Sequence, residues 1–544
     1  MRIPDRTLLQ WLDDPAPDRG LHFAQPDGTW DFWPYTRLWN LSLRVVSACA
    51  ERGLRNGDVV AIVQRCGPGF VAGMFGALAA GATVTSIAPP FAFQRGDDYE
   101  RHLSHVLGIA RPALIVVGDD GDLARVAPIA DAAGLAAPVR FDDLVAGRAP
   151  EWPTGRAETA LLQFTSGSSG FSRGVRISPD ALAANVNAIR RHLLLTPDGP
   201  IINWMPVHHD MGLIGGLITS VVTGCDGWLM QPEDFIRTPL RYLSCISDQR
   251  IRFAPMPNFG LAYILRRIRP EQLAGLRFDS LRAVILGAER IDPRVLVEFE
   301  RLLGPNGLDR RALTPAYGSA EATLAVTMLP LEETWSTAAP DGASTPLVGC
   351  GRPIGGTPVR VVNARGGPAP DGEVGQIVVG GESLATGYVG DSGTASGTSI
   401  QDGLLYTGDA GFVRDGQLFV LGRLGDGLKV RGRMVFAESL EARFCELGIP
   451  ERRAAALLGI RDGRPTAAVV LAAPRPEWPA IARRVLAEQI EGADLVAVTV
   501  PRAGLAVTSS GKPRRRVMWQ AFCDGTLEGD IRPLAPEPAP AGTP

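Results

Sequence analysis

Short apolar runs alternate with amphipathic, helix-like segments along the chain, and this alternation limits the folds that the chain can adopt. The apolar run ALIVVG at 113–118 is followed by an amphipathic segment at 180–193 and by a second apolar run, LRAVILGA, at 281–288. Short apolar runs of this kind are typical of strands buried on both faces of a sheet, and the amphipathic segments can supply the helices that cover it. The pattern therefore predicts an α/β architecture with parallel sheets.

One long uncharged stretch needs a separate interpretation. Residues 66–94 contain no charged side chain, and a stretch of that length could be mistaken for a membrane span. Glycines interrupt it, and the pair Pro89–Pro90 lies near its end. We expect a buried helix over VAGMFGALAA and a buried strand over ATVTSIA, with no integral membrane segment.

The pattern changes toward the C-terminus. From about 350 to 421 the chain consists of short strands and turns, such as TPVRVVN and EVGQIVVGG, which predicts a small β-rich subdomain. Past Gly422 a helical run (FAESLEARFCEL) and a strand-like run (TAAVVLAA) predict a smaller, mobile α+β domain. We therefore expect a large N-terminal domain over 1–422 with two parallel-type α/β sheets, a C-terminal domain over 426–530 and a disordered Pro/Ala-rich tail over 531–544.

The composition excludes several classes of protein. The 544 residues are 45% hydrophobic, enough to bury a large core. A net charge of −3, from 55 basic and 58 acidic residues, gives no electrostatic basis for binding nucleic acid. The seven cysteines are scattered without CxxC spacing, so neither a disulfide framework nor a zinc site is expected. The N-terminal MRIPDRTLLQWLDD has no apolar signal-peptide run, and we expect a cytoplasmic protein.

Lysine is almost absent from the chain. Of the 55 basic residues, only Lys429 and Lys512 are lysines, and the others are arginine. Lysine offers a compact, rotatable point charge, whereas arginine presents a wide planar fork. A lysine retained in such a chain is a candidate for chemistry that arginine cannot perform. The alternative is the chance survival of two surface lysines.

The segment LLQFTSGSSGFSRGVRIS at 161–178 joins a strand-like run to a loop of Thr, Ser and Gly that ends at Arg173 and Gly174. Glycines let backbone N–H groups turn inward, hydroxyls add donors, and Arg173 adds positive charge, which together suit a polyphosphate. The loop is not a Walker A motif, because Gly-Lys-Ser/Thr is missing. An ordinary Ser/Gly turn remains the alternative for the loop alone.

Further motifs follow this loop along the chain. They are NWMPVHHDMGLIGGL at 203–217, GAE at 287–289, AYGSAEAT at 316–323, YTGDAGF at 406–412, GRLGDGLKVRG at 422–432 and TSSGKPRRR at 508–516. With TSGSSGFSRG they resemble, in content and order, the motifs of the adenylate-forming superfamily (acyl-CoA synthetases, adenylation domains, luciferases and fatty acyl-AMP ligases). The usual first motif ends in Pro-Lys-Gly, whereas this chain has Ser172-Arg173-Gly174.

The resemblance implies that a substrate carboxylate attacks the α-phosphorus of ATP and releases pyrophosphate. Lys512 would bridge the two reactants as a catalytic residue, Glu321 would hold Mg²⁺ with a weaker contribution from Thr165, and Asp409 would bind the ribose. Tyr317 would stack on adenine. The implied ATP/AMP-binding residues are Thr165, Ser166, Gly167, Ser168, Ser169, Gly170, Arg173, Gly174, Gly287, Ala288, Glu289, Ala316, Tyr317, Gly318, Asp409 and Arg423. The alternatives are structural roles: a solvated basic stretch, a helix cap, a turn or a core aromatic.

Within the superfamily, HHDMGLIGG and the stretch from MQPEDF to PNFGLAY are similar to the fatty acyl-AMP ligase branch. His209 would line the entrance for the carboxylate, as a second catalytic residue. A metal site at His208–His209 is not expected, because adjacent histidines rarely point the same way and no third ligand is nearby in the sequence. The implied acyl-binding residues are His209, Asp210, Met211, Gly215, Met230, Asn258 and Phe259.

Two departures from that branch concern the acceptor of the acyl group. The branch carries an inserted segment, thought to exclude coenzyme A, and the interval 324–349 looks too short to hold all of it. The hinge, centred on Gly425 and Asp426, has a second glycine at Gly427, and the two glycines make it looser than usual. Lys429 lies where coenzyme A-using relatives often place a lysine, which implies a role in the thioester step; a solvent-facing lysine is the alternative.

The resemblance therefore implies a ligase that uses ATP and Mg²⁺ to convert a carboxylic, fatty-acid substrate to acyl-AMP. The acyl group would then pass to the phosphopantetheine of an acyl carrier protein, in polyketide, nonribosomal peptide or lipid biosynthesis. An acyl-CoA synthetase is the nearest alternative. A nucleotide-using enzyme of another class, such as a kinase, and a degenerate adenylate-binding scaffold are more distant ones.

Overall fold

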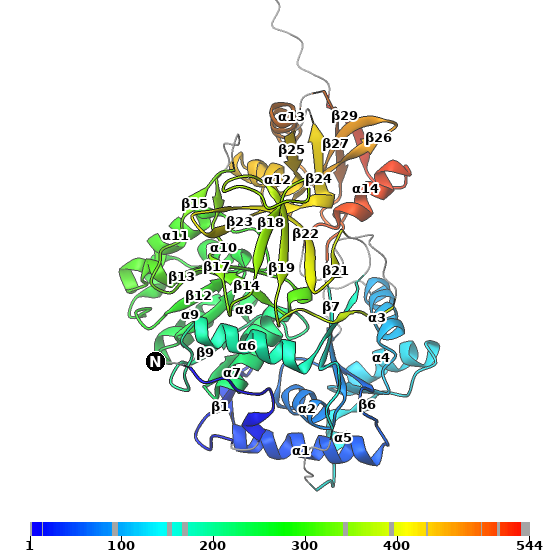
Figure 1. Cartoon of the computed structure of the whole chain (residues 1–544), viewed down its shortest axis with the longest axis vertical. Coiled ribbons are helices and arrows are strands. Elements are labelled where there is room, and N and C mark those ends of the chain that lie inside the picture. Colours follow the sequence, from blue (N-terminus) through cyan, green and yellow to red (C-terminus); the bar gives the residue numbers. More distant parts are fainter. Residues whose placement is uncertain are drawn as a thin grey trace, which may run out of the picture.

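The computed structural model describes residues 3–12, 15–89, 96–149, 155–165, 172–340, 346–390, 397–430, 433–490, 492–508 and 512–534. Two large sheets form the body of the molecule, a β-rich part lies between this body and the C-terminal part, and the C-terminal part lies at one end (Figure 1). The mixed α/β fold that the sequence predicts is confirmed.

The larger sheet has nine strands, of which the central ones are parallel. In spatial order they are β17 (Arg352–Pro353), β14 (Ala325–Met328), β13 (Leu313–Gly318), β12 (Ala283–Leu286), β11 (Phe253–Met256), β9 (Ile201–Asn203), β10 (Gly227–Leu229), β1 (Gly20–Ala24) and β2 (Trp30–Pro34). The helices connected to it are α7 (Thr219–Thr223), α8 (Pro232–Arg237), α9 (Pro239–Asp248), α10 (Asn258–Arg267), α11 (Pro293–Leu303) and a π-helical segment, η2 (Met211–Ile218).

The second sheet has seven strands, five of them parallel. In spatial order they are β20 (Gly387–Tyr388), β8 (Gly174–Ile177), β7 (Leu161–Phe164), β4 (Thr83–Ile87), β3 (Val59–Val63), β5 (Leu114–Val117) and β6 (Val139–Arg140). Its helices are α1 (Tyr35–Glu51), α2 (Pro68–Ala79), α3 (Gly96–Ala110), α4 (Asp120–Ala132), α5 (Phe141–Val145) and α6 (Pro179–His192).

The uncharged stretch folds as expected into buried α2 and β4. Residues 70–79 of α2 are all buried, in a core that joins strands of both sheets. Gly76 permits close packing of α2 on α1, because a Cβ at this position would lie 2.4 Å from the Ser42 carbonyl oxygen. No helix in the described part of the chain combines the length and apolar character needed to cross a membrane.

The β-rich part forms a separate antiparallel sheet. Its strands are β18 (Val359–Val362), β19 (Gly375–Gly380), β22 (Leu404–Arg414), β21 (Ser399–Gln401) and β23 (Gln417–Arg423). Asp409 on β22 and Arg423 on β23 lie opposite each other in this hairpin, so the two strands bring them together. A short 3-10 turn, η7 (Leu424–Asp426), then leads into the C-terminal part.

The C-terminal part, which we call the small domain (residues 427–534), has its own sheets and core. It contains β24 (Gly427–Val430), β25 (Arg433–Phe436), α12 (Ala437–Glu446), β26 (Ala454–Arg461), β27 (Arg464–Ala472), α13 (Trp478–Gln489), β28 (Asp494–Val500), α14 (Arg515–Cys523) and β29 (Asp530–Pro533). The sequence predicts disorder from residue 531, and here the structure differs. β29 pairs with the edge of β28, whose unpaired backbone groups accept another strand. Residues 535–544 lie outside the described residues.

Candidate active site

The carboxyl ends of β7, β11, β12 and β13 meet around a cavity of about 290 Å³. This is where open α/β sheets usually bind ligands, because the loops that leave parallel strands converge at this edge. Gly425 and Asp426 of the hinge and Lys512 of the small domain also line the cavity. The site is therefore assembled from both large sheets, the hinge and the small domain.

Strained backbone forms part of the cavity wall. Ala288, directly after Gly287 at the end of β12, adopts a left-handed φ of 67°. Thr323, which directly precedes the lining residue Leu324, also has a positive φ, 68°, a rare conformation for a β-branched residue. The backbone at Gly318 packs closely against Leu324. Any other residue at this position would clash, because its Cβ would lie only 1.7 Å from the Leu324 carbonyl oxygen. Strain of this kind persists where the surrounding structure fixes it, and it clusters at functional sites.

Tyr317, Asp409 and Arg423 form one hydrogen-bonded group. The Tyr317 hydroxyl donates to Asp409 Oδ2 at 2.6 Å, and Arg423 Nε lies 2.8 Å from Asp409 Oδ1. Arg423 also donates to the Thr407 carbonyl oxygen at 3.1 Å. The nearby Asp409 carboxylate raises the pKa of Arg423, and burial raises the pKa of Tyr317 well above its ordinary value. The group fixes the Tyr317 ring, which itself lines the cavity.

Arg173, Glu321 and Tyr388 form a second group. Arg173 Nη2 lies 3.2 Å from Glu321 Oε1, which also accepts a hydrogen bond from the Tyr388 hydroxyl at 2.8 Å. The Arg173 guanidinium lies over the Tyr388 ring, with Cζ 4.0 Å from the centroid. Arg173 Nη1 is buried without a hydrogen-bond partner in the described structure. A buried donor without a partner is costly, so this group is ready to bind an anion.

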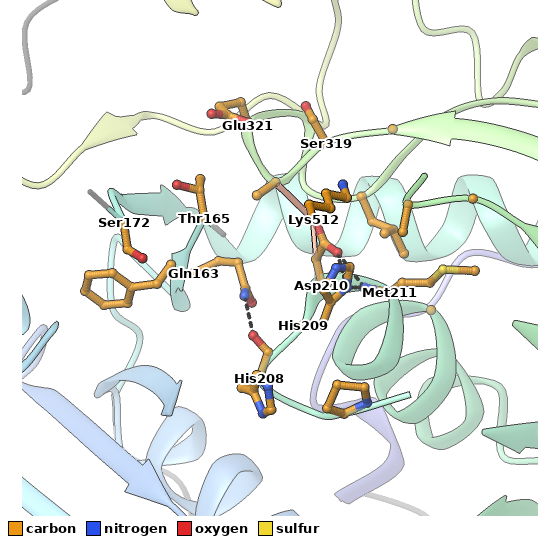
Figure 2. A pocket seen from close by; sticks show the side chains of 18 of the residues that line it. Gln163, Thr165, Ser172, His208, His209, Asp210, Met211, Ser319, Glu321 and Lys512 are labelled. Carbon is orange, nitrogen blue, oxygen red and sulfur yellow. Dashed lines mark hydrogen bonds and ion pairs between the residues drawn. The ribbon is translucent and has the colours of Figure 1, made fainter. Parts of the chain in front are cut away.

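Lys512 lies in the cavity beside Asp210 and His209 (Figure 2). Two hydrogen bonds join Lys512 to Thr508: Thr508 N donates to the Lys512 carbonyl oxygen at 2.8 Å, and Lys512 N donates to Thr508 Oγ1 at 3.1 Å. Burial lowers the pKa of the Lys512 amine, while Glu289, Asp210 and Asp409 raise it and Arg423 lowers it. The amine therefore belongs to the charged environment of the cavity rather than to solvent.

His208 and His209 point in different directions, as Figure 2 shows. His209 Nδ1 lies 2.8 Å from Asp210 Oδ1, and the Asp210 carboxylate also accepts a hydrogen bond from Met211 N at 2.7 Å, where η2 begins. Burial lowers the pKa of His208 to about 3, so this residue is neutral at physiological pH. The Gln163 amide donates to the His208 carbonyl oxygen at 3.0 Å, which ties the motif to β7.

The structure brings most of the predicted residues together. Those that line the cavity are Thr165, Arg173, His209, Asp210, Met211, Gly215, Gly287, Ala288, Ala316, Tyr317, Gly318, Glu321, Arg423, Gly425, Asp426 and Lys512. Asp409 does not line the cavity itself, but it contacts Tyr317 and Arg423, which do. Residues 166–170 of the expected phosphate loop lie outside the described residues.

Other predicted residues lie away from the cavity lining. Met230 is buried in the core of the nine-stranded sheet. Asn258 is buried and accepts a hydrogen bond from Asp292 N at 3.0 Å, while Phe259 N donates to Glu289 Oε1 at 2.5 Å. Gly174 begins β8. Lys429 is exposed on β24, with no part in the cavity lining.

Several lining residues were not predicted. Ser86, Tyr99 and His102 come from β4 and α3, and Ile189 and Leu193 come from α6 and its end. The amphipathic pattern at 180–193 pointed to a buried helix face but not to a cavity. His102 could have been considered as a site residue from the sequence, because the chain has only six histidines.

Comparison with known proteins identifies the class of protein. The sequence profile of the AMP-binding enzyme family matches residues 6–389. The chain therefore belongs to the AMP-binding enzyme family. The resemblance to the adenylate-forming superfamily, and within it to fatty acyl-AMP ligases, is confirmed, as is the prediction of an acid–AMP ligase.

Individual relatives match over nearly the whole chain. The long-chain-fatty-acid–AMP ligase FadD26 of Mycobacterium marinum is 28% identical, over 98% of this chain and 100% of the relative. The medium-chain-fatty-acid–[acyl-carrier-protein] ligase JamA of Moorena producens is 30% identical, over 89% of each chain. A solved structure from a study of fatty acyl-adenylate ligases of E. coli and L. pneumophila has a TM-score of 0.85 at 27% identity, covering 96% of this chain and 99% of that one.

Proposed function

We propose that the chain activates a fatty acid with ATP to give acyl-AMP and pyrophosphate, and then passes the acyl group to the phosphopantetheine thiol of an acyl carrier protein. The observation that carries the proposal is the position of Lys512, inside a cavity that also holds the Tyr317–Asp409–Arg423 group and Arg173. The names of the relatives FadD26 and JamA support both the substrate class and the carrier-protein acceptor.

In the first half-reaction a carboxylate oxygen of the acid attacks the α-phosphorus, a new P–O bond forms, and the bond to pyrophosphate breaks. Both reactants are anions, so preorganised positive charge is the main contribution that the protein can make. The Lys512 ammonium would neutralise charge between the carboxylate and the α-phosphate. Arg173 Nη1, which has no hydrogen-bond partner in the described structure, would bind the departing phosphates.

The residues present fit a magnesium ion next to those phosphates. Glu321 is almost completely buried and lines the cavity, and its Oε2 receives no hydrogen bond from the described residues. The hydroxyl of Thr165 lines the same cavity. Mg²⁺ prefers one or two carboxylates together with phosphate oxygens and water, so Glu321 would hold it, with Thr165 nearby. The ion would supply charge neutralisation on the triphosphate.

The ribose and adenine would lie against the Tyr317–Asp409–Arg423 group. The Asp409 carboxylate is already oriented by the Tyr317 hydroxyl and by Arg423, which suits hydrogen bonds from two ribose hydroxyls. Tyr317 and the backbone at Gly287 and Ala288 form the cavity wall where the adenine would stack.

The fatty chain would occupy the apolar part of the cavity. This part is lined by Ile189, Leu193, Pro255, Ile285, Leu324 and Met328. Met211 and Gly215 on η2 line the same cavity as the His209–Asp210 pair and Lys512, so an acid bound there would direct its carboxylate toward Lys512. An apolar wall favours a hydrocarbon chain but separates chains that differ by one methylene by only about 1–3 kcal/mol.

A specific observation favours coenzyme A as the alternative acceptor. Between β14 and β17 the structure has a short pair of strands, β15 (Thr337–Ala338) and β16 (Leu347–Val348), rather than a large inserted unit in the described residues. Lys429 is exposed on β24, next to the hinge, and would be available to the thioester step after a rotation of the small domain.

Product analysis by mass spectrometry tests the proposal and separates the two acceptors. The enzyme is incubated with Mg-ATP and a panel of carboxylic acids, with coenzyme A and a holo-carrier protein both present. We expect acyl-AMP and loaded carrier protein with little acyl-CoA. Abundant acyl-CoA would place the chain with the synthetases, and the absence of acyl-AMP with every acid would contradict the proposed first half-reaction.

The rate of acyl-AMP formation should depend on pH through Lys512. Because burial lowers the pKa of this amine, the active ammonium loses its proton at a lower pH than an ordinary lysine, whose pKa is about 10.4. The single-turnover rate should therefore fall as the pH rises through this lowered pKa. The Lys512→Arg variant should lack the fall, because guanidinium stays charged. A wild-type rate that is flat up to the ordinary lysine pKa would contradict the prediction.

A further inference from the structure

We infer that Arg452 is a positioning residue: it clamps the small domain onto the large body in the orientation that places Lys512 in the cavity. The inference rests on the proposed function, since it assigns Arg452 to acyl-AMP formation and not to thioester formation. Arg452 lies in the turn between α12 and β26, away from the cavity lining.

Two contacts across the domain boundary carry the inference. The Arg452 guanidinium lies over the Phe259 ring, with Cζ 4.3 Å from the centroid, and Nη2 lies 4.0 Å from Glu289 Oε2. The two partners are themselves joined, because Phe259 N donates to Glu289 Oε1 at 2.5 Å. Cation–π contact and ion pairing thus act on the same guanidinium, which arginine can satisfy with its face and its edge at once.

Glu289 connects this clamp to the catalytic cavity. It directly follows Ala288, a lining residue with a left-handed backbone. Its carboxylate also favours the charged form of Lys512 more strongly than any other described side chain does. Two cations of the small domain, Arg452 and Lys512, therefore act on one carboxylate of the large body. Two points of attraction restrict the rotation of the small domain more than one point does.

Arg452 and Lys512 belong to one rigid unit. The neighbouring Arg453 fastens the turn to β27, because it donates to the carbonyl oxygens of Ala472 and Ala473 at 2.9 and 2.8 Å. On the other side, the Lys512 loop leads into α14, which packs into the core formed with β26, β27 and β28. A rotation that removes Lys512 from the cavity must therefore also separate Arg452 from Phe259 and Glu289.

The backbone of Arg452 supports a functional constraint on this turn. Its φ is 62°, a left-handed conformation that costs energy for a residue with a side chain. The same residue makes the contacts with Phe259 and Glu289. Glycine would adopt the same backbone without strain, so Arg452→Gly removes the contacts and relieves the strain, whereas Arg452→Ala removes the contacts alone.

The test measures the two half-reactions separately. Single-turnover acyl-AMP formation is compared with thioester formation from supplied acyl-AMP, for wild type, Arg452→Ala, Arg452→Gly, Arg452→Lys and Arg453→Ala. We expect both the Ala and the Gly variant of Arg452 to form acyl-AMP about tenfold more slowly, with thioester formation within twofold of wild type, and Arg452→Lys to recover part of the loss. Arg453→Ala is the matched control, since its contacts lie within the small domain, and it should not separate the two rates.

A second measurement does not depend on activity. Amide hydrogen exchange over 256–263, from the end of β11 into the first part of α10, should rise in Arg452→Ala and Arg452→Gly but not in Arg453→Ala, because the small domain would no longer cover Phe259. Equal slowing of both half-reactions, adenylation within twofold of wild type, or unchanged exchange over 256–263 would overturn the inference. Failure of the wild-type enzyme to form acyl-AMP would instead refute the proposed function, and the exchange comparison would still test the clamp.

Discussion

Replacing Lys512 with alanine should lower the single-turnover rate of acyl-AMP formation by at least about 100-fold. Removal of one preorganised donor that stabilises developing charge typically costs about 2.7–4 kcal/mol, or 10²–10³ in rate. Arg423 and Arg173 also line the cavity, but Arg423 is held by Asp409 and Arg173 by Glu321, so neither is placed to take over the role of Lys512. The measurement is rapid-quench detection of acyl-AMP with saturating ATP and acid.

The other lysine provides the comparison. Lys429 lies outside the cavity lining, so the Lys429→Ala variant should form acyl-AMP at a nearly normal rate. Any loss of activity in this variant should occur in thioester formation. A rate of acyl-AMP formation within about fivefold of wild type in Lys512→Ala would show that the catalytic assignment of Lys512 is wrong. A larger effect of Lys429→Ala on adenylation than on thioester formation would exclude its assignment to the second step.

Asp409→Asn should reduce kcat/KM for ATP by about 100-fold. The carboxylate orients Tyr317, neutralises Arg423 and would bind the ribose hydroxyls. Hydrogen bonds to charged groups contribute about 1.5–3 kcal/mol each, and the neutral amide weakens several of them together. Initial rates at varied ATP concentration measure the effect, and thermal unfolding checks that the variant is folded.

Asp415→Asn is the matched control for this prediction. Asp415 lies at the exposed turn of the same β22–β23 hairpin, with a left-handed φ of 52° that asparagine also tolerates. We expect this variant to keep the wild-type kcat/KM for ATP. If Asp409→Asn changes kcat/KM less than tenfold, Asp409 is a structural partner of Arg423 rather than a nucleotide ligand.

The sequence predicted the parts of the fold that depend on local pattern. The burial of α2 and β4 followed from a run without charge, and the position of α6 followed from its amphipathic period. β29 was missed because Asp530–Pro533 is exposed and has no alternating apolar pattern; its pairing with the edge of β28 makes it a strand.

The candidate site was predictable where a motif supplies its own chemistry. Tyr317, Asp409, Arg423 and Lys512 were recognised in separate motifs, and the structure places them around one cavity or one hydrogen-bonded group. The apolar lining was not predictable in the same way. Leu193 and Met328 are ordinary core residues by type, and only the packing of α6 against β14 makes them part of a wall. Phe259, which we placed in the acyl pocket, lies under Arg452 instead.

Gly425 and Asp426 line the cavity, so the joint between the two domains forms part of its wall. A molecule that fills the cavity would therefore limit the backbone conformations of the hinge, and a change in the hinge conformation would change the shape of the cavity. By thermodynamic linkage, the occupancy of the cavity and the angle of the joint must each shift the other by the same factor. If the small domain rotates in the proposed reaction, its rotation and the departure of pyrophosphate would be coupled equilibria, with no need for a separate sensor.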